Sequence, residues 1–322
     1  MSEPILLVGA GAMAIQYARV LEAMGRELVV LGRGQESADA FHAETGVTPT
    51  TGALDEQLTN LAAVPDEAII TVNAMHLAEV TVAVARAGAK RILVEKPAAL
   101  DAAEVQSLLD VAAETGAEIR VAYNRRFLAS VIAARQMIAE DGGVLSVKFD
   151  FSEPARRIGA MGKPERELEA WFFANSTHVV DLAFSFVGPV DLAAGAVAGG
   201  VDWHPSGGVF AGFARSADGA LLSWHANWAG PGRWGVEVIT PERRLILRPL
   251  EGLSIQDQSS FAEQVVDIDL GPDAEFKPGL YRQVQAFLTG EGSEHLPDIA
   301  EHARQWPLYE AVCTGTAFPP AS

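Results

Sequence analysis

A short glycine-rich segment, Gly9–Ala14 (GAGAMA), is the first part of the sequence whose residue types indicate a chemistry. It follows an apolar run, Ile5–Val8, and opens a segment whose apolar residues have helical spacing. In dinucleotide-binding proteins, such glycines permit a tight bend and a close approach of the backbone to a pyrophosphate, which the helix N-terminus binds. We therefore expect a dinucleotide here; a glycine-rich turn without a ligand is the alternative. The expected contacts are Gly9, Gly11, Ala12 and Met13.

The end of the second expected strand bears on which dinucleotide binds. An NAD site usually has an Asp or Glu there, which accepts hydrogen bonds from the ribose hydroxyls. In Leu31–Ser37 (LGRGQES) no acid stands at the strand tip, and Arg33 occupies that place. A guanidinium can pair with a 2′-phosphate and stack on adenine. We expect NADP, held by Gly32, Arg33 and Ser37. The alternative is a solvated Arg33 with Glu36 in the acidic role, and hence NAD.

A lysine ends another expected strand, in Val94–Pro97 (VEKP). The carboxyl ends of parallel strands form the edge of the sheet where ligands bind. The adjoining Pro97 fixes the turn and is a candidate for a cis peptide bond. We expect the Lys96 ammonium to lie near the nicotinamide and to bond to a substrate oxygen. A surface lysine beside a turn proline is the alternative.

Several motifs, in order along nearly the whole chain, resemble those of the Gfo/Idh/MocA oxidoreductases. Besides the glycine-rich turn and the Glu95-Lys96-Pro97 motif they are Thr71–His76 (TVNAMH), Tyr123–Phe127 (YNRRF), Asn175–Leu182 (NSTHVVDL) and Lys277–Tyr281 (KPGLY). The resemblance implies a Rossmann domain followed by an α/β domain with a large, mostly antiparallel sheet. It also implies hydride transfer between NAD(P) and a hydroxyl or carbonyl carbon, often on a sugar, without a metal.

The resemblance also implies roles for individual residues. His178 corresponds to the catalytic histidine and would exchange a proton near neutral pH, while Lys96 would stabilise the alkoxide charge. Without the resemblance, a lone histidine on an apolar helix is more often a core residue. The further cofactor contacts expected are Asn73, His76, Glu95, Lys96 and Arg126. The substrate contacts expected are Tyr123, Arg125, Asn175 and His178.

One position departs from the family pattern. Many members have an aspartate four residues before this histidine, and Ala174 stands there in this chain. No carboxylate can orient His178 from that position, and Asn175 is expected to face elsewhere on the helix. Asp181 is an alternative support, although its usual role is structural. The departure favours, as the alternative function, a cofactor-binding regulatory or non-catalytic protein; reduction of a non-sugar carbonyl or imine is a third hypothesis.

The elements that must position these residues change in kind near residue 125. Before it, strands alternate with helices, which is typical of a doubly wound parallel sheet, and Asp101 is the expected N-cap of one helix. After it, short strands separated by Gly and Pro predict a mostly antiparallel sheet. The expected strands are Ile5–Val8, Glu27–Leu31, Ala68–Val72, Arg91–Val94, Glu118–Ala122, Val144–Ser152, Leu192–Val197, Val209–Arg215, Leu221–Asn227, Gly235–Ile239, Leu245–Leu247 and Val265–Asp269. The expected helices are Met13–Met24, His76–Ala87, Ala102–Thr115, Ala129–Ala139, His178–Phe186, Gly279–Leu288 and Ile299–Val312.

Length and charge complete the prediction. The 322 residues favour two domains, which we place at 1–124 for NADP binding and 125–322 for substrate binding and oligomerisation. A net charge of −18 disfavours nucleic acid and anionic membranes as partners. The single cysteine excludes an intramolecular disulfide and a cysteine metal cluster. With neither a signal peptide nor a membrane span in the pattern, we expect a cytoplasmic protein, and a homodimer or homotetramer formed through the C-terminal sheet.

Overall fold

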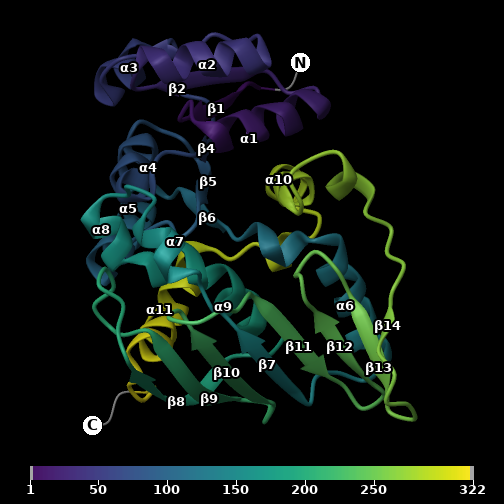
Figure 1. The fold of residues 1–322 in the computed structure, drawn as a ribbon. Helices are drawn as coiled ribbons and strands as arrows, with labels where there is room; N and C mark the ends of the chain where they lie inside the picture. The colour runs from purple at the N-terminus through teal and green to yellow at the C-terminus, as the bar shows by residue number, and fades with distance from the viewer. Residues whose placement is uncertain (1–2, 320–322) are drawn as a thin grey trace. The chain divides into compact units, whose positions relative to one another are not determined.

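The computed structural model describes residues 3–319, within which the strands form two sheets (Figure 1). The chain divides into two units. The first consists of the chain up to Tyr123 together with Ala274–Ala303, and the second of Asn124–Asp273 together with the chain from Arg304 onward. The predicted boundary lies one residue from the first crossing, whereas the return of Ala274–Ala303 to the first unit has no counterpart in the prediction. Residues 1–2 and 320–322 of the predicted domains lie outside the described residues.

The sheet of the first unit is parallel throughout, with the strand order β3-β2-β1-β4-β5-β6. Its strands are β1 (Ile5–Val8), β2 (Leu28–Gly32), β3 (Thr50–Thr51), β4 (Glu67–Ile70), β5 (Arg91–Glu95) and β6 (Glu118–Ala122). All four residues of β1 are buried, as expected for a central strand whose two faces are both covered. The predicted doubly wound sheet is therefore confirmed.

The helices of this unit follow the strands and agree with the prediction wherever their apolar faces are wide. They are α1 (Ala12–Ala23), α2 (Gln35–Thr45), α3 (Leu54–Asn60), η1 (Ala74–His76), α4 (Leu77–Arg86) and α5 (Ala102–Thr115). The Asp101 carboxylate accepts a hydrogen bond from the Glu104 N–H at 2.9 Å, which confirms the predicted N-cap of α5. The sequence did not predict α2 or α3, because each buries only two side chains and has little apolar periodicity.

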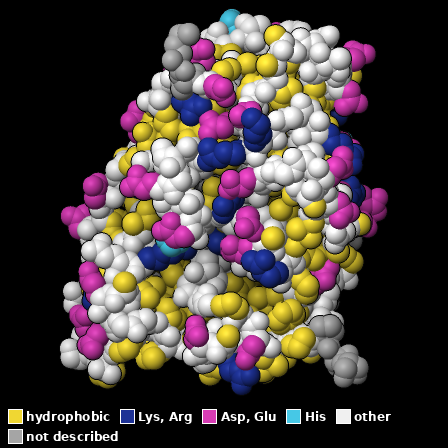
Figure 2. All heavy atoms as spheres, turned by 180° about the vertical axis from the view of Figure 1, so that it is seen from behind, with side chains coloured by type: hydrophobic (Ala, Val, Ile, Leu, Met, Phe, Trp, Pro, Cys, Tyr) yellow, Lys and Arg dark blue, Asp and Glu magenta, His cyan; other side chains and the backbone are white. Residues whose placement is uncertain are grey.

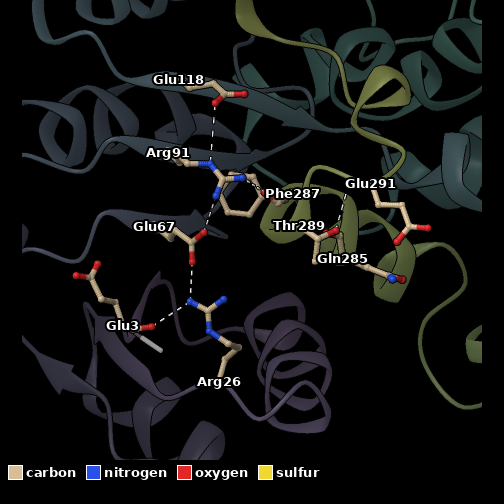
Figure 3. A network of polar contacts seen from close by, with 9 residues as sticks. All are labelled: Glu3, Arg26, Glu67, Arg91, Glu118, Gln285, Phe287, Thr289 and Glu291. Carbon is tan, nitrogen blue, oxygen red and sulfur yellow. Dashed lines mark hydrogen bonds and ion pairs between the residues drawn. The ribbon is translucent and has the colours of Figure 1, made fainter. Parts of the chain in front are cut away.

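The return segment contributes α10 (Leu280–Thr289) and η5 (Ser293–His295) to the first unit. A polar network ties α10 to the amino-terminal ends of the strands (Figure 3). Arg91, the first residue of β5, pairs with Glu67 at 2.7 Å, donates to the backbone carbonyl of Phe287, and lies 5.0 Å from the centre of the Phe287 ring. Glu67 also pairs with Arg26 at 2.6 Å. One carboxylate thus joins two guanidinium groups, of which that of Arg91 lies over a buried aromatic ring.

The sheet of the second unit has the order β14-β13-β12-β11-β7-β10-β9-β8, and only its β7–β10 pair is parallel among the described strands. Its strands are β7 (Ser146–Asp150), β8 (Val190–Ala198), β9 (Val209–Ser216), β10 (Leu221–Asn227), β11 (Gly235–Ile239), β12 (Arg243–Leu247), β13 (Ser254–Asp257) and β14 (Gln264–Val265). The predicted mostly antiparallel sheet is confirmed. The predicted strand Val265–Asp269 is wrong beyond Val265, because only Gln264 and Val265 pair with β13.

Helices cover one face of this sheet, and the other face is open. The other elements are η2 (Asn124–Phe127), α6 (Ala129–Glu140), α7 (Ala155–Gly159), α8 (Glu165–Glu169), the π-helical η3 (Phe172–Ser176), α9 (Thr177–Phe184), η4 (Gly271–Ala274) and α11 (Ile299–Thr314). Every residue of α9 is buried. Along β10, by contrast, buried and exposed side chains alternate, with Trp224 facing the core and Leu221 exposed.

Figure 2 shows one face of the molecule, on which acidic and basic side chains are interspersed and hydrophobic side chains lie between them. The negative charge is therefore dispersed over this face and does not form one acidic patch. Among the described helices, none has both the length and the apolar composition needed to cross a bilayer.

Candidate active site

A cavity of about 1010 Å³ lies in the first unit, where β1, β2 and β4 end. In this sheet the strand order reverses between β1 and β4, and ligands of doubly wound sheets bind at that point, at the carboxyl ends of the strands. The predicted cofactor residues that line the cavity are Gly9, Gly11, Gly32, Arg33, Ser37, Asn73 and His76. The predicted residues outside its lining are Ala12, Met13, Glu95, Lys96 and Arg126.

The backbone at Gly9 explains why the turn needs glycine. Gly9 has a φ of +120°, and a Cβ there would lie 2.5 Å from Thr71 Oγ1 and 2.9 Å from the Thr71 carbonyl oxygen. At Gly11, the N-cap of α1, a Cβ would meet nothing within 4 Å. No side chain of the described residues caps α1, and its first turn holds no acid. Its first N–H groups thus remain available to an anion, which fits a pyrophosphate.

Both candidates for recognising the adenosine ribose line the same cavity. Arg33 directly follows β2 and is exposed, and Glu36 lies in the first turn of α2. Ser37 donates its hydroxyl proton to the Gly34 carbonyl oxygen at 3.0 Å, which orders the turn between them. The structure therefore brings a cation and an anion to one cavity beside β2, as the two alternative predictions required.

Residues of η1 and α4, and Asn73 before them, also line the cavity. Asn73 Oδ1 accepts a hydrogen bond from the Met75 N–H at 3.0 Å and thereby caps η1. The His76 ring nitrogen Nδ1 lies 2.5 Å from Glu79 Oε1. These contacts hold two of the predicted cofactor residues on the wall, with Glu79 beside them in the lining.

Glu95 is an internal anchor of the Glu95-Lys96-Pro97 motif. The Tyr17 hydroxyl donates to Glu95 Oε1 at 2.7 Å, inside the first unit. Burial raises the pKa of Glu95 above its ordinary value, whereas Lys96, Tyr17 and Lys277 act in the opposite direction. The peptide bond between Lys96 and Pro97 is cis, as the sequence suggested. The motif is thus fixed at the end of β5 by groups of α1 and of the return segment.

His178 lies in the first turn of α9, in the second unit, and is buried. Its ring centre lies 5.9 Å from that of Trp234. Lys96 belongs to the first unit and His178 to the second, so their joint action stays a prediction. Asn175 is two residues before the start of α9, and its amide donates to Glu153 at 2.8 Å.

Three of the predicted residues have their side chains engaged in the protein. Arg126 forms two hydrogen bonds with the Asp181 carboxylate, at 2.8 and 2.7 Å, and both groups are buried. Asp181 also accepts from the Tyr309 hydroxyl at 2.9 Å, which agrees with a structural role. Arg125 pairs with Glu251 at 2.8 Å, and Tyr123 is fully buried. Contacts of these residues with a ligand stay predictions.

Glu153 is the residue of this region that sequence reasoning missed. It follows β7, is 5% exposed, and its Oε1 accepts from Asn175 Nδ2 at 2.8 Å and from Ser176 Oγ at 2.9 Å. Burial raises its pKa to about 7, although the hydrogen bonds from Ser176 and Asn175 act in the opposite direction. A lone glutamate after an apolar strand was the only signal, and nothing in the sequence linked it to residues 22 and 23 positions later.

The parallel sheet, the turn that requires glycine at Gly9 and the uncapped α1 define a Rossmann-type dinucleotide-binding protein. Residues 4–123 match the model of an oxidoreductase family with a NAD-binding Rossmann fold. This match over the first part of the chain confirms the resemblance to the Gfo/Idh/MocA family identified from the sequence. No curated protein matches the chain in sequence.

Solved structures share the fold over nearly the full length. UDP-N-acetylglucosamine 3-dehydrogenase from Acidithiobacillus ferrooxidans is 19% identical with a TM-score of 0.72, and the match covers 97% of each chain. An oxidoreductase from Agrobacterium radiobacter, in complex with NAD+, L-tartaric acid and magnesium, is 13% identical with a TM-score of 0.78, over 98% of each chain. Levoglucosan dehydrogenase in complex with NADH is 18% identical with a TM-score of 0.74, over 96% of this chain and 95% of the other. These likenesses establish the two-unit fold.

Proposed function

We propose that the protein is an NADP(H)-dependent oxidoreductase that transfers a hydride between the nicotinamide and a hydroxyl or carbonyl carbon of a sugar or sugar-like substrate. The observation that carries the proposal is the cavity that begins at Gly9 and Gly11 and has Arg33 at its ribose end. Two of the structures that share the fold are dehydrogenases named for UDP-N-acetylglucosamine and levoglucosan, which supports a sugar-like substrate.

The choice of NADP rests on Arg33. It occupies the position after β2 where NAD-binding proteins have an acid, and its guanidinium is free to form two charge-assisted bonds with a 2′-phosphate. The presence of Glu36 in the same lining, and the NAD+ and NADH of two structures that share the fold, favour NAD as the alternative.

The proposed chemistry assigns one role to each of two side chains. The dinucleotide supplies or accepts the hydride. The Lys96 ammonium stabilises negative charge on the reacting oxygen, and His178 exchanges that oxygen's proton. Glu95, held by Tyr17, fixes the backbone from which Lys96 extends.

Replacement of the lysine tests this assignment. Lys96→Met should lower turnover by roughly two orders of magnitude and leave NADP affinity nearly unchanged, because the ammonium acts on the substrate oxygen. Turnover is measured from the absorbance of the reduced nicotinamide in a screen of sugars and polyols, and affinity by calorimetry. Lys90→Met, at an exposed lysine paired with Asp66, is the control. Unchanged turnover in Lys96→Met would refute the role.

A non-catalytic, cofactor-binding protein is the second candidate, and Ala174 is the observation that favours it, because the family's aspartate is absent there. Binding of NADP without turnover of any sugar, polyol, carbonyl or imine in the screen would favour this candidate. If only non-sugar carbonyls or imines are turned over, the assignment as an oxidoreductase stands and the proposed substrate class changes.

We also propose a homo-oligomer formed through the open face of the second sheet, in a cytoplasmic protein. Three large apolar side chains on neighbouring strands support this: Leu192 on β8, Phe213 on β9 and Leu221 on β10, which are 37%, 50% and 56% exposed. Arg215 is opposite both Leu192 and Leu221, so these side chains share one face. Exposed apolar surface of this kind usually marks an interface.

A further inference from the structure

A buried carboxyl group holds the turn that leads into His178. Glu153 Oε1 accepts two hydrogen bonds, from the side chains of Asn175 and Ser176, three and two residues before the histidine. Both donors belong to the π-helical segment η3, which continues directly into α9. The loop after β7 and the start of the histidine-bearing helix are thus joined at one oxygen atom.

The aromatic ring that lies beside His178 also influences Glu153. The indole of Trp234 favours the charged form of Glu153, and the ring centre of Trp234 is 5.9 Å from that of His178, at an interplanar angle of 53°. The turn before His178 is thus hydrogen-bonded to Glu153, and the indole beside the imidazole favours the carboxylate form of the same residue.

Position 174, from which the helical segment itself could supply a carboxylate, is an alanine. Ala174 is buried and apolar, and the Asp181 carboxylate is occupied by Arg126 and Tyr309. The charged groups on α7 are Arg156 and Arg157, and those on α8 are Glu165, Arg166, Glu167 and Glu169. Glu167 pairs with Lys163. Glu153 is hydrogen-bonded to two side chains of η3.

We propose that Glu153 is the positioning residue for His178, taking from the loop after β7 the role that a carboxylate at position 174 would have. The inference rests on the proposed function, in which His178 exchanges the substrate's proton. Glu153 does not need to touch the substrate: it fixes the turn, and its charged form favours the imidazolium form of His178.

The test uses Glu153→Gln in the full-length protein, which retains an oxygen for Asn175 and Ser176 but removes the charge. We expect the pKa of His178, followed by NMR titration and assigned with His178→Asn, to fall by roughly half a unit, less than for a direct ion pair. We expect kcat to fall about tenfold with the Kd for NADP unchanged. Glu153→Asp, which keeps the charge, should leave the pKa of His178 closer to the wild-type value.

Glu167→Gln is the matched control, because Glu167 is also buried in the second unit but pairs with Lys163. If the pKa of His178 and kcat are the same in Glu153→Gln as in Glu167→Gln, the proposal is overturned. If His178→Asn itself leaves turnover unchanged, the catalytic assignment of the proposed function fails, whereas the NMR titration, which needs no substrate, still decides the inference.

A reciprocal measurement applies even if Glu153→Gln does not fold. Coupling between two titrating groups is mutual, so His178→Asn should raise the pKa of Glu153, observed through its side-chain carboxyl carbon, by a similar roughly half unit. An unchanged Glu153 titration in His178→Asn would show that the two groups are not coupled and would overturn the proposal.

Discussion

At the scale of single residues, the chemistry depends on where charges are held. Arg33 is exposed and lines the cavity, whereas Arg126 is buried against Asp181, although the sequence predicts both as cofactor ligands. A guanidinium already paired in the core contributes to the fold, while an exposed one remains available to a phosphate. The two glutamates differ in the same way: Glu36 lies in the cavity lining and is available to a ligand, whereas Glu153 is buried and hydrogen-bonded within the protein.

Arg33→Ala should weaken NADP binding by roughly 30-fold or more and NAD binding by less than threefold, because only NADP has the 2′-phosphate that a charge-assisted pair would recognise. Calorimetric titration of both cofactors measures the two affinities. Arg19→Ala, at an exposed arginine paired with Glu44, is the control. Equal losses for both cofactors would rule out the NADP assignment, and a loss specific to NAD in Glu36→Gln would favour the alternative.

Glu153 should make the stability of the protein depend on pH. Its pKa is about 7 in the folded protein against an ordinary value of 4.5, so the folded state binds more protons between these pH values. Stability relative to Glu153→Gln should therefore fall as the pH rises through this interval, by up to about 3 kcal/mol. Thermal unfolding of both proteins at pH 5 and pH 8 measures this; a constant difference would contradict the raised pKa.

Among the helices and strands, apolar periodicity predicts those whose buried faces follow a regular pattern. It does not predict features that depend on contacts between residues far apart in the sequence. The central strands β1 and β5 and the helix α5 were predicted within a residue or two, because a buried strand or a wide apolar helix face is written in the local pattern. The π-helical η3 was not predicted, since its geometry leaves no pattern in the local sequence. The cavity could be placed from the glycine turn, but the Glu153–Ser176 contact joins residues 23 positions apart.

The helix α10 offers a test at this scale. Phe287 is 2% exposed beneath Arg91, so Phe287→Ala should destabilise the protein by roughly 3–5 kcal/mol, through the lost apolar contacts and the cavity left behind. Phe276→Ala removes a partly exposed ring from the same return segment and should cost far less. Hydrogen exchange should show the loss of protection in α10, and equal effects of the two substitutions would contradict this account.

At the scale of the whole molecule, the open sheet face predicts the oligomeric state. Phe213→Glu combined with Leu221→Glu places charges among exposed apolar side chains and should convert the oligomer into monomers, as light scattering after gel filtration would show. Phe261→Glu is the control, since Phe261 is fully exposed and lies outside the three strands of the face. A monomeric wild-type protein, or an equal effect of both changes, would contradict the proposed interface.

The path of the chain between the two units determines which fragments of the protein can be expressed separately. The chain passes from one unit to the other after Tyr123, after Asp273 and after Ala303, so no single cut separates them. A truncated product that stops after β6 would lack α10 and leave Arg91 without Phe287. An autonomous nucleotide-binding fragment would require the codons for Ala274–Ala303 to be spliced back through a designed linker. Conversely, a separately expressed piece carrying α10 should complement the truncated product in trans.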